Sequence, residues 1–146
     1  MLGHEPGGVV VEVGESVTHL KVDDRVALEP GKTCGHCEFC RTGRYNLCPD
    51  VIFFATPPVD GVFQEYVTHE TDLCFKLPDN VSTLEGALIE PLAVGFHAAN
   101  QGGAHAGQTN VKGVVTDLFE FDDIQNAMDR SVADKANIVK AVVKID

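Results

Sequence analysis

Four cysteines at short, regular spacing constrain this chain more than any other feature. They follow the pattern C-x2-C-x2-C-x7-C, and they are Cys34, Cys37, Cys40 and Cys48. Spacings of two residues let neighbouring thiolates converge on one ion, and the longer loop brings the fourth sulfur round to complete a tetrahedron. Four protein ligands leave no open coordination position. The pattern therefore predicts a structural zinc site, in a lobe at residues 32–50, that stabilises the fold and does no chemistry.

Composition bounds the rest of the protein. The 146 residues are enough for one domain with a core, and the formal net charge of -11 argues against nucleic acid and anionic membranes as partners. No stretch is long and apolar enough to span a bilayer, and the first residues lack a secretory-signal pattern. We therefore expect a cytoplasmic protein, in which thiols bind metal rather than form disulfides. Cys74 lies between apolar neighbours and is predicted to be a small core residue.

Hydrophobic patterning predicts a mostly β fold with a few helices. A capping box at residues 82–85 begins one helix, which should end or break at Pro91, and a second helix should then run over residues 92–101. Asp122 is expected to cap a further helix that ends near residue 133, with Ile124, Ala127 and Met128 on one face. The expected strands cover residues 9–13, 24–29, 62–67, 73–77 and 137–145.

Several motifs occur in an order and at spacings that identify a family. Besides the cysteine pattern, they are Gly3-His4-Glu5, Phe54-Ala55-Thr56-Pro57-Pro58, Lys76-Leu77-Pro78-Asp79-Asn80, and Glu90-Pro91-Leu92-Ala93-Val94-Gly95 with His97. Together they closely resemble the zinc-containing polyol dehydrogenases, the sorbitol and xylitol dehydrogenase branch of the medium-chain dehydrogenase/reductase superfamily. The resemblance implies a partial GroES-like barrel with a four-cysteine zinc lobe. Residues 1–109 resemble the latter half of the catalytic domain, and residues 110–146 the C-terminal segment that returns to it.

Parts of the family pattern have no counterpart in this sequence. The family begins with a further stretch that supplies a cysteine ligand to the catalytic zinc, and it carries a Rossmann domain between the segments that match Thr109 and Asn110. The portion after that domain, which usually brings an arginine and a tyrosine to the polyol, is also absent. The glycine-rich run at residues 102–107 lacks the G-x-G-x-x-G pattern and follows an expected helix rather than a strand. We therefore expect no NAD to bind this chain.

The resemblance implies a second, catalytic zinc site. In the family the histidine of Gly-His-Glu, here His4, ligates the zinc, the adjacent Glu5 is a ligand directly or through water, and Glu90 resembles the second carboxylate. Zinc lowers the pKa of a bound hydroxyl group, so such a site suits an alcohol substrate. Without the family context, His4 and Glu5 would be an ordinary surface pair and Glu90 a surface carboxylate at a helix end. Because the family's cysteine is absent, we expect weak or empty occupancy.

The resemblance also implies a substrate pocket. Phe53, Phe54 and Thr56 match the family's pocket wall, and an apolar wall beside a hydroxyl group suits a polyol. Two adjacent phenylalanines are equally ordinary in a hydrophobic core, so both interpretations stay open. His97 is interpreted as a packed or capping histidine rather than a catalytic one, and His36 and His69 as surface residues.

Two functions remain open from the sequence. The first is a catalytic-domain piece of an NAD-dependent zinc polyol dehydrogenase. The intact enzymes of this family convert a sugar alcohol to a ketose by hydride transfer, and we expect this chain alone to be inactive. The second is a non-catalytic, zinc-stabilised β module that acts by binding or subunit contact. A homo-oligomer is compatible with either function. A thiol redox switch is disfavoured, because coordination to zinc quenches thiolate reactivity.

Overall fold

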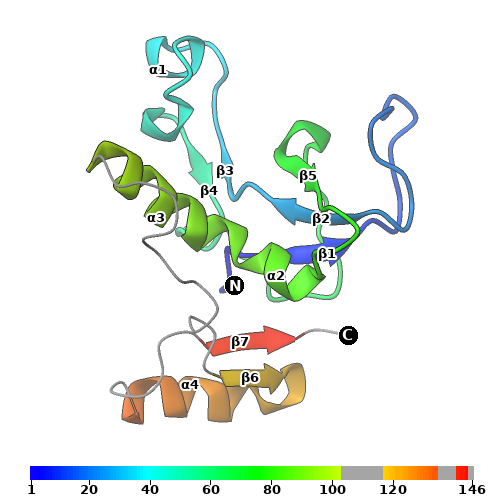
Figure 1. Ribbon diagram of the computed structural model, residues 1–146, viewed down its shortest axis with the longest axis vertical. Coiled ribbons are helices and arrows are strands. Elements are labelled where there is room, and N and C mark those ends of the chain that lie inside the picture. The colour runs from blue at the N-terminus through cyan, green and yellow to red at the C-terminus, as the bar shows by residue number, and fades with distance from the viewer. Residues whose placement is uncertain (103–116, 135–140, 145–146) are drawn as a thin grey trace. The chain divides into compact units, whose positions relative to one another are not determined.

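The computed structural model of the protein describes residues 1–102, 117–134 and 141–144 (Figure 1). The chain divides into two compact units, Met1–Gly95 and Phe96–Asp146. The expected junction between Thr109 and Asn110, and the glycine-rich run from Gly103 onward, lie outside the described residues. The assignment of residues 1–109 and 110–146 to two parts of one domain therefore stays a prediction.

The first unit is built on a three-stranded antiparallel sheet. Its strands, in spatial order, are β1 (Gly7–Val9), β2 (Arg25–Leu28) and β5 (Cys74–Lys76). The central strand β2 pairs on both sides, with Val26 opposite Gly8 on one edge and opposite Lys76 on the other. Val26 and Ala27 are buried, as is Leu77 just after β5. The strands expected at residues 24–29 and 73–77 are thus confirmed.

A separate two-stranded ribbon carries the cysteine-rich loop. β3 (Gly31–Lys32) pairs antiparallel with β4 (Ile52–Phe53), and the chain between them forms the short helix α1 (Glu38–Arg41) and the 3-10 helix η1 (Tyr45–Leu47). Figure 1 shows this loop at one end of the first unit, with β3 and β4 at its base. The ribbon therefore joins the loop to the rest of the unit.

The capping box produces the predicted helix start. α2 (Thr83–Ala87) begins after Ser82, whose hydroxyl accepts a hydrogen bond from the Glu85 N–H at 3.2 Å while the Glu85 carboxylate accepts one from the Ser82 N–H at 2.8 Å. α3 (Ile89–Gln101) follows directly. The break falls just before Pro91 rather than at it, because a proline in the first turn lacks only an N–H that has no intrahelical partner.

The strand expected at residues 62–67 does not form, and this prediction was wrong. The N–H groups of residues 61–63 instead donate irregularly to the carbonyls of Met1, Gly3 and Leu2, at 3.0, 2.9 and 3.1 Å respectively. Gly3 has a φ of +89°, outside the β region, so a regular ladder cannot continue along this edge. Apolar alternation alone does not form a strand where the partner backbone is bent.

The strand expected at residues 9–13 is also shorter than the pattern suggested. It forms only as β1, which ends at Val9. Opposite this end, Asp23 adopts a left-handed conformation with φ +72°, and hydrogen bonds from Val10 to Asp24 and from Asp23 to Val10 replace the ladder. The valines that follow in the expected strand, Val11 and Val13, are exposed.

The second unit contains a parallel strand pair and a helix. β6 (Asp117–Glu120) pairs with β7 (Ala141–Lys144), and between them lie the 3-10 helix η3 (Phe121–Asp123) and α4 (Ile124–Ala133). β7 lies within the final strand expected at 137–145, and it pairs with β6, which patterning does not predict. The helix begins one residue later than expected, with Asp123 rather than Asp122 at its N-cap, because η3 precedes it.

One face of α4 contributes to the core of this unit. Ala127 and Phe119 are buried, whereas Met128 is 47% exposed and so lies off the face on which periodicity had placed it. Arg130 reaches back to β6, where its guanidinium pairs with Asp117 at 2.9 Å and lies 5.8 Å from the centroid of the Phe119 ring. In the described part of the chain, no helix is both long and apolar enough to cross a membrane.

Candidate metal sites

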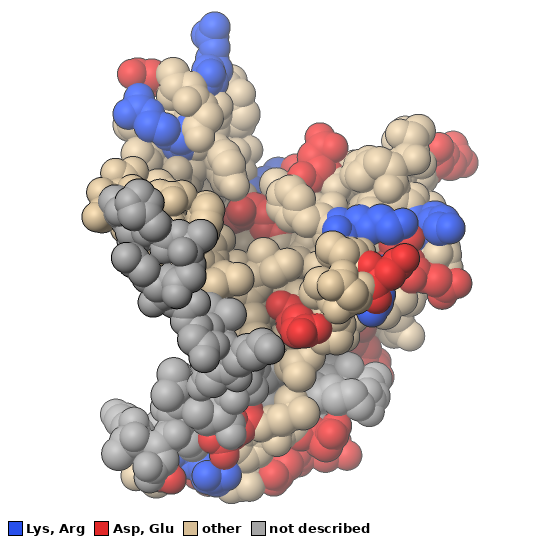
Figure 2. All heavy atoms as spheres, in the orientation of Figure 1, with Lys and Arg blue, Asp and Glu red and all other residues tan. Residues whose placement is uncertain are grey.

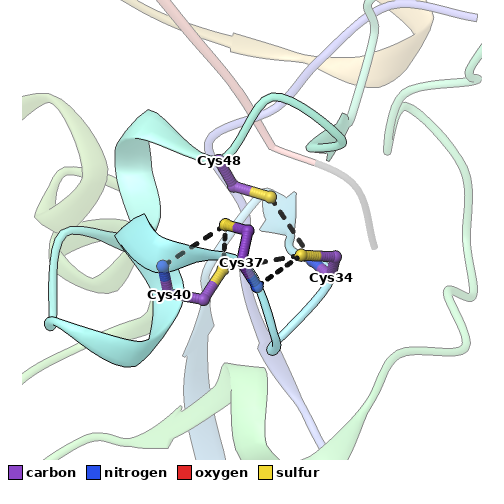
Figure 3. Close-up of side chains that lie close together, drawn as sticks. All are labelled: Cys34, Cys37, Cys40 and Cys48. Carbon is purple, nitrogen blue, oxygen red and sulfur yellow. Dashed lines mark hydrogen bonds between the residues drawn. The ribbon is translucent and has the colours of Figure 1, made fainter.

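The four cysteines of the predicted zinc site converge at one point of the lobe. Their sulfur atoms all lie within 4.8 Å of one another (Figure 3). The Sγ atom of Cys40 lies 3.5 Å from that of Cys37 and 3.9 Å from that of Cys34. A tetrahedron of sulfurs bound to zinc at about 2.3 Å has edges of about 3.8 Å. The sulfur positions therefore fit a tetrahedral zinc ion.

The backbone of the lobe holds the sulfurs in these positions. The Cys37 N–H points at the Cys34 sulfur at 3.4 Å, and the Cys40 N–H at the Cys37 sulfur at 3.5 Å, so that Cys37 caps α1 with its own thiol. The Cys34 N–H points at the sulfur of Cys48, the buried member of the set, at 3.5 Å. Such N–H groups stabilise thiolate charge, as ligand sulfurs require.

The thiols of the cluster differ in pKa, because their hydrogen bonds and their burial differ. Hydrogen bonds from the backbone N–H groups of His36 and Cys37 lower the pKa of Cys34 to about 6. The backbone N–H of Cys40 lowers the pKa of Cys37, but burial and the neighbouring thiols outweigh it and raise that pKa to about 11. Because a bound metal requires all four groups as thiolates, binding must release protons from this cluster.

Cys74 stands apart from the cluster. It is half-buried rather than a core residue, which corrects the sequence-based prediction, and burial raises the pKa of its thiol. The thiol donates to the Glu70 carbonyl at 3.3 Å. All five cysteines are free thiols in the structure.

A second cluster forms from residues far apart in the sequence. His4 and Glu5 precede β1, while Glu90 is the second residue of α3, and their ligand atoms lie within 4.8 Å of one another. None of the three side chains is fully buried. One imidazole nitrogen and two carboxylate oxygens form a donor set that zinc accepts, and three protein ligands leave a coordination position open to a further molecule. The donor chemistry therefore fits a catalytic type of zinc site.

Close backbone contacts place the two halves of this cluster. Adding a Cβ atom to Gly61 would make it clash with the carbonyl oxygens of Leu2 and Gly3, so a glycine lets this segment lie against the residues just before His4. On the other side, α2 packs against β1 and leads directly into α3 and Glu90. The segment that carries His4 and Glu5 is thus held by the chain around Gly61, and the segment that carries Glu90 is held through α2, both in the same unit.

The expected pocket-wall residues separate in the structure. The Phe53 ring lies against the His4 imidazole, with ring centroids 5.6 Å apart, so this residue does reach the cluster. Phe54 instead packs against His69 at 4.9 Å. Thr56 is exposed in the turn that follows β4. The roles of Phe53 and Thr56 toward a substrate stay predictions.

The three histidines set aside in the sequence have different surroundings. His36 is exposed, and its Nδ1 lies 2.8 Å from the Cys34 carbonyl oxygen. His97 is exposed on α3 rather than packed. The surface interpretation of His69 was wrong: it is half-buried, and its Nε2–H donates to the Glu29 carbonyl at 2.9 Å. This contact joins residues that are far apart in the sequence, so no local sequence pattern could have predicted it.

Acidic side chains are widespread on the visible face of the described residues. Figure 2 shows aspartate and glutamate side chains spread over this face, and lysine or arginine side chains at the end that carries α1 and at other places among the acidic ones. In this lobe Arg44 lies 3.9 Å from Glu38 and stacks its guanidinium 5.4 Å from the Phe39 ring centroid. Positive charge beside a thiolate cluster offsets part of its negative charge.

Comparison with known proteins assigns this arrangement to a family. Residues 1–79 match the model of the alcohol dehydrogenase GroES-like domain. The chain belongs to the alcohol dehydrogenase GroES-like family. The matched region contains the four cysteines, His4 and Glu5, and it confirms the expected GroES-like fold and the resemblance to the zinc-containing, medium-chain dehydrogenases.

The similar curated proteins include sorbitol dehydrogenases and a probable D-xylulose reductase. The chain is 59% identical over 112 residues to sorbitol dehydrogenase of Arabidopsis thaliana, covering 76% of this chain and 30% of that protein. It is 56% identical over 109 residues to sorbitol dehydrogenase of Bacillus subtilis, covering 75% and 31%. The probable D-xylulose reductase A of Aspergillus clavatus is 51% identical over 111 residues, with 76% and 31% covered. The chain spans somewhat under a third of the length of these relatives.

Solved structures agree with the fold. An oxidoreductase of unknown specificity from Escherichia coli superposes with a TM-score of 0.69 at 39% identity, over 97% of this chain and 39% of that one. L-idonate 5-dehydrogenase of Escherichia coli superposes with a TM-score of 0.62 at 31% identity, over 97% and 40%. The fold of this chain therefore corresponds to part of a longer dehydrogenase fold.

Proposed function

We propose that this chain is the catalytic-domain part of a zinc-dependent polyol dehydrogenase, with His4, Glu5 and Glu90 as the residues that hold the catalytic metal. The observation that supports it is the convergence of these three ligand atoms within 4.8 Å of one another. Their residues come from a loop before β1 and from the first turn of α3, and local sequence gives no reason for them to meet. The similarity to sorbitol dehydrogenases and to a probable D-xylulose reductase supports the substrate class, a sugar alcohol or its ketose.

The chain's own residues would share the work at this site. The imidazole of His4 and the carboxylates of Glu5 and Glu90 would hold the metal, and Phe53 and Thr56 would line the side on which the polyol lies. A divalent metal in such a site supplies Lewis-acid chemistry to a substrate hydroxyl group. The two carboxylates reduce the net charge of the bound ion and leave it weaker as an acid than an all-histidine site would.

The four cysteines have a different role in this proposal. Their closed set of sulfur ligands holds a structural zinc ion, which stabilises the lobe and leaves no position for a substrate. The sequence contains no dinucleotide-binding fingerprint, so we assign no residue of this chain to the nicotinamide cofactor. We therefore propose that the chain alone carries the metal and substrate side of the reaction without turning over.

A cobalt titration tests the catalytic site directly. The chain is first loaded with one zinc in the cysteine lobe, and Co²⁺ is then added while its visible spectrum is recorded. We expect a second, weaker site whose spectrum lacks sulfur-to-cobalt charge transfer, and whose bands change when sorbitol is added. His4→Ala should abolish this site, while His97→Ala, which changes an exposed histidine outside the cluster, should keep it.

Two results would contradict the proposal. One is a zinc-loaded chain that takes up no further Co²⁺ at millimolar concentration. The other is a second Co²⁺ site that His4→Ala leaves intact, because the metal would then be held elsewhere. A cobalt spectrum insensitive to sorbitol, xylitol and D-xylulose would retain the metal site and reject the substrate class.

A further inference from the structure

We propose that Phe53 is a positioning residue that ties the His4–Glu5–Glu90 cluster to the four-cysteine lobe, so that metal in the lobe strengthens metal binding at the cluster. This inference rests on the proposed function, since it assigns a regulator to the same site. It is carried by three contacts along one path: Phe53 to His4, Phe53 to Gly31, and the β3–β4 ribbon to the cysteine loop.

The first contact fixes the ligand histidine. The rings of Phe53 and His4 have centroids 5.6 Å apart and an interplanar angle of 54°. This is a tilted arrangement within the range in which aromatic pairs attract. A histidine ligand binds metal more tightly when a neighbouring group holds its ring in one orientation, because less freedom is lost on binding. Phe53 supplies such a group from outside the ligand set.

The second contact fixes Phe53 itself. Phe53 pairs with Gly31 across the ribbon, and a Cβ atom added to Gly31 would lie 3.3 Å from Cδ2 of the Phe53 ring. The ring therefore lies close against the backbone of β3. One residue further on, the Phe54 N–H donates to the Pro30 carbonyl at 3.1 Å. The backbone around Phe53 is thus fastened to the strand that leads into the lobe.

The third link makes this arrangement depend on the lobe. β3 ends at Lys32, shortly before Cys34, and β4 begins at Ile52, shortly after Cys48. Each strand has two residues, and two-stranded ribbons of this kind are marginally stable by themselves. A metal ion that draws the four cysteines together also holds the two strands in register. Loss of that metal should release the ribbon and, with it, the ring that orients His4.

The two metal sites are therefore expected to be coupled. Metal in the lobe should raise the affinity of the cluster, and by linkage the cluster metal should raise the affinity of the lobe. Replacing Phe53 should break the coupling without removing a ligand of either site. Ile52 is the matched control, because it occupies the same strand, projects to the opposite face and is 52% exposed.

The first experiment needs no metal at the cluster. The imidazole C–H resonances of His4, assigned with His4→Ala, are recorded in the full chain with one zinc in the lobe. We expect a ring-current shift that disappears in Phe53→Leu, persists in Phe53→Tyr and Ile52→Ala, and collapses when a chelator removes the lobe zinc. His4 resonances that are the same in the wild type and Phe53→Leu, or that ignore the lobe zinc, would overturn the proposal.

The second experiment measures the coupling. Co²⁺ affinity at the cluster is determined for the zinc-loaded wild type, Phe53→Leu, Phe53→Tyr and Ile52→Ala, with retained lobe zinc as the check on folding. We expect Phe53→Leu to weaken cluster binding by about 10- to 100-fold, the usual effect of removing a group that orients a ligand, and Phe53→Tyr to restore it. Equal affinity in the wild type and Phe53→Leu would overturn the proposal.

The two experiments separate this inference from the proposed function. If the His4 resonances depend on Phe53 and on lobe zinc but Co²⁺ never binds the cluster, the proposed function and the coupling of metal affinities fail, while the positioning of His4 by Phe53 stands. If Co²⁺ binds the cluster with sorbitol-sensitive bands and Phe53→Leu has no effect on either readout, the proposed function stands and this inference fails.

Discussion

Asp24 is the buried charged side chain among the described residues, and its contacts explain why it is tolerated. The residue is 7% exposed, and its carboxylate accepts hydrogen bonds from Lys76 Nζ at 2.6 Å and from the Lys21 N–H at 3.0 Å. The hydrogen bond from Lys76 lowers the pKa of Asp24 below its ordinary value of 3.8. The ion pair joins the residue just before β2 to the last residue of β5.

This contact predicts a pH dependence of stability. The folded-state pKa of Asp24 is lowered, so the unfolded chain binds more protons at about pH 4, and the free energy of unfolding rises with pH in that range. The contribution is complete above the unfolded pKa and is lost as the pH falls through the lowered one. We expect Asp24→Asn to flatten the pH profile of Tm between about pH 3 and 5. An unchanged slope in this variant would show that other carboxylates dominate.

Gly61 illustrates a residue that only the structure explains. An added methyl group would clash with the carbonyl oxygens of Leu2 and Gly3, so we expect Gly61→Ala to lower the free energy of unfolding by about 1–3 kcal/mol, measured by urea denaturation. Gly14→Ala is the matched control, because its methyl group would meet only Val17, at 4.0 Å. Equal stability of the two variants would mean that the chain before His4 can move aside at little cost.

At the scale of elements, those whose formation depends on local sequence were predicted well, and those that depend on distant partners were predicted poorly. The start of α2 followed from Ser82 and Glu85, because a capping box is complete within four residues of sequence. The strand at 62–67 failed, because its formation depends on a distant partner that is bent at Gly3. β6 was missed for a related reason, since its pairing with β7 joins segments separated by α4. Pairing depends on tertiary context that a window of sequence does not contain.

The lobe is the element whose stability should depend on metal. Cys48→Ser removes the buried sulfur of the cluster, and we expect zinc content to fall from about one ion per chain to near zero, with loss of the lobe's structure. Structural zinc binding in small domains has an apparent free energy on the order of 10 kcal/mol, so a chelator should have the same effect on the wild type. Elemental analysis and circular dichroism measure both changes.

Cys74→Ser provides the control for this prediction. It also removes a thiol, but Cys74 lies outside the cluster and is half-buried. Its zinc content should equal that of the wild type. Zinc lost equally from both variants, or a wild type with no zinc, would contradict the assignment of the four cysteines as a metal site.

At the scale of the whole molecule, the two candidate sites were accessible from the sequence to different degrees. The cysteine site followed from spacing, because short spacings place the sulfurs together in almost any fold. His4, Glu5 and Glu90 came from family resemblance, since nothing in their local sequence indicates that a loop before β1 meets the start of α3. The Phe53–His4 contact could not be foreseen either, because it depends on the register of β3 and β4.

The relation of this chain to its longer relatives leads to a prediction about activity. Hydride transfer requires a nicotinamide held a few ångströms from the reacting hydroxyl, and a misplacement of about 1 Å can cost ~100-fold in rate. The sequence has no G-x-G-x-x-G fingerprint to position the cofactor's pyrophosphate at a helix start. We therefore expect the 146-residue chain alone to show no NAD binding by calorimetry and no NAD-dependent oxidation of sorbitol or xylitol.

The full-length Bacillus subtilis sorbitol dehydrogenase, assayed in parallel, is the positive control for both measurements, since the chain matches about a third of it. Adding a separately produced cofactor-binding portion of that relative tests whether another chain can supply NAD binding. Activity that appears only in the mixture, and that His4→Ala removes, would support the metal site while leaving the prediction for the isolated chain intact. Micromolar NAD affinity of the isolated chain, or sorbitol oxidation that His4→Ala abolishes, would contradict it, because the cofactor would then be positioned by residues without the usual fingerprint.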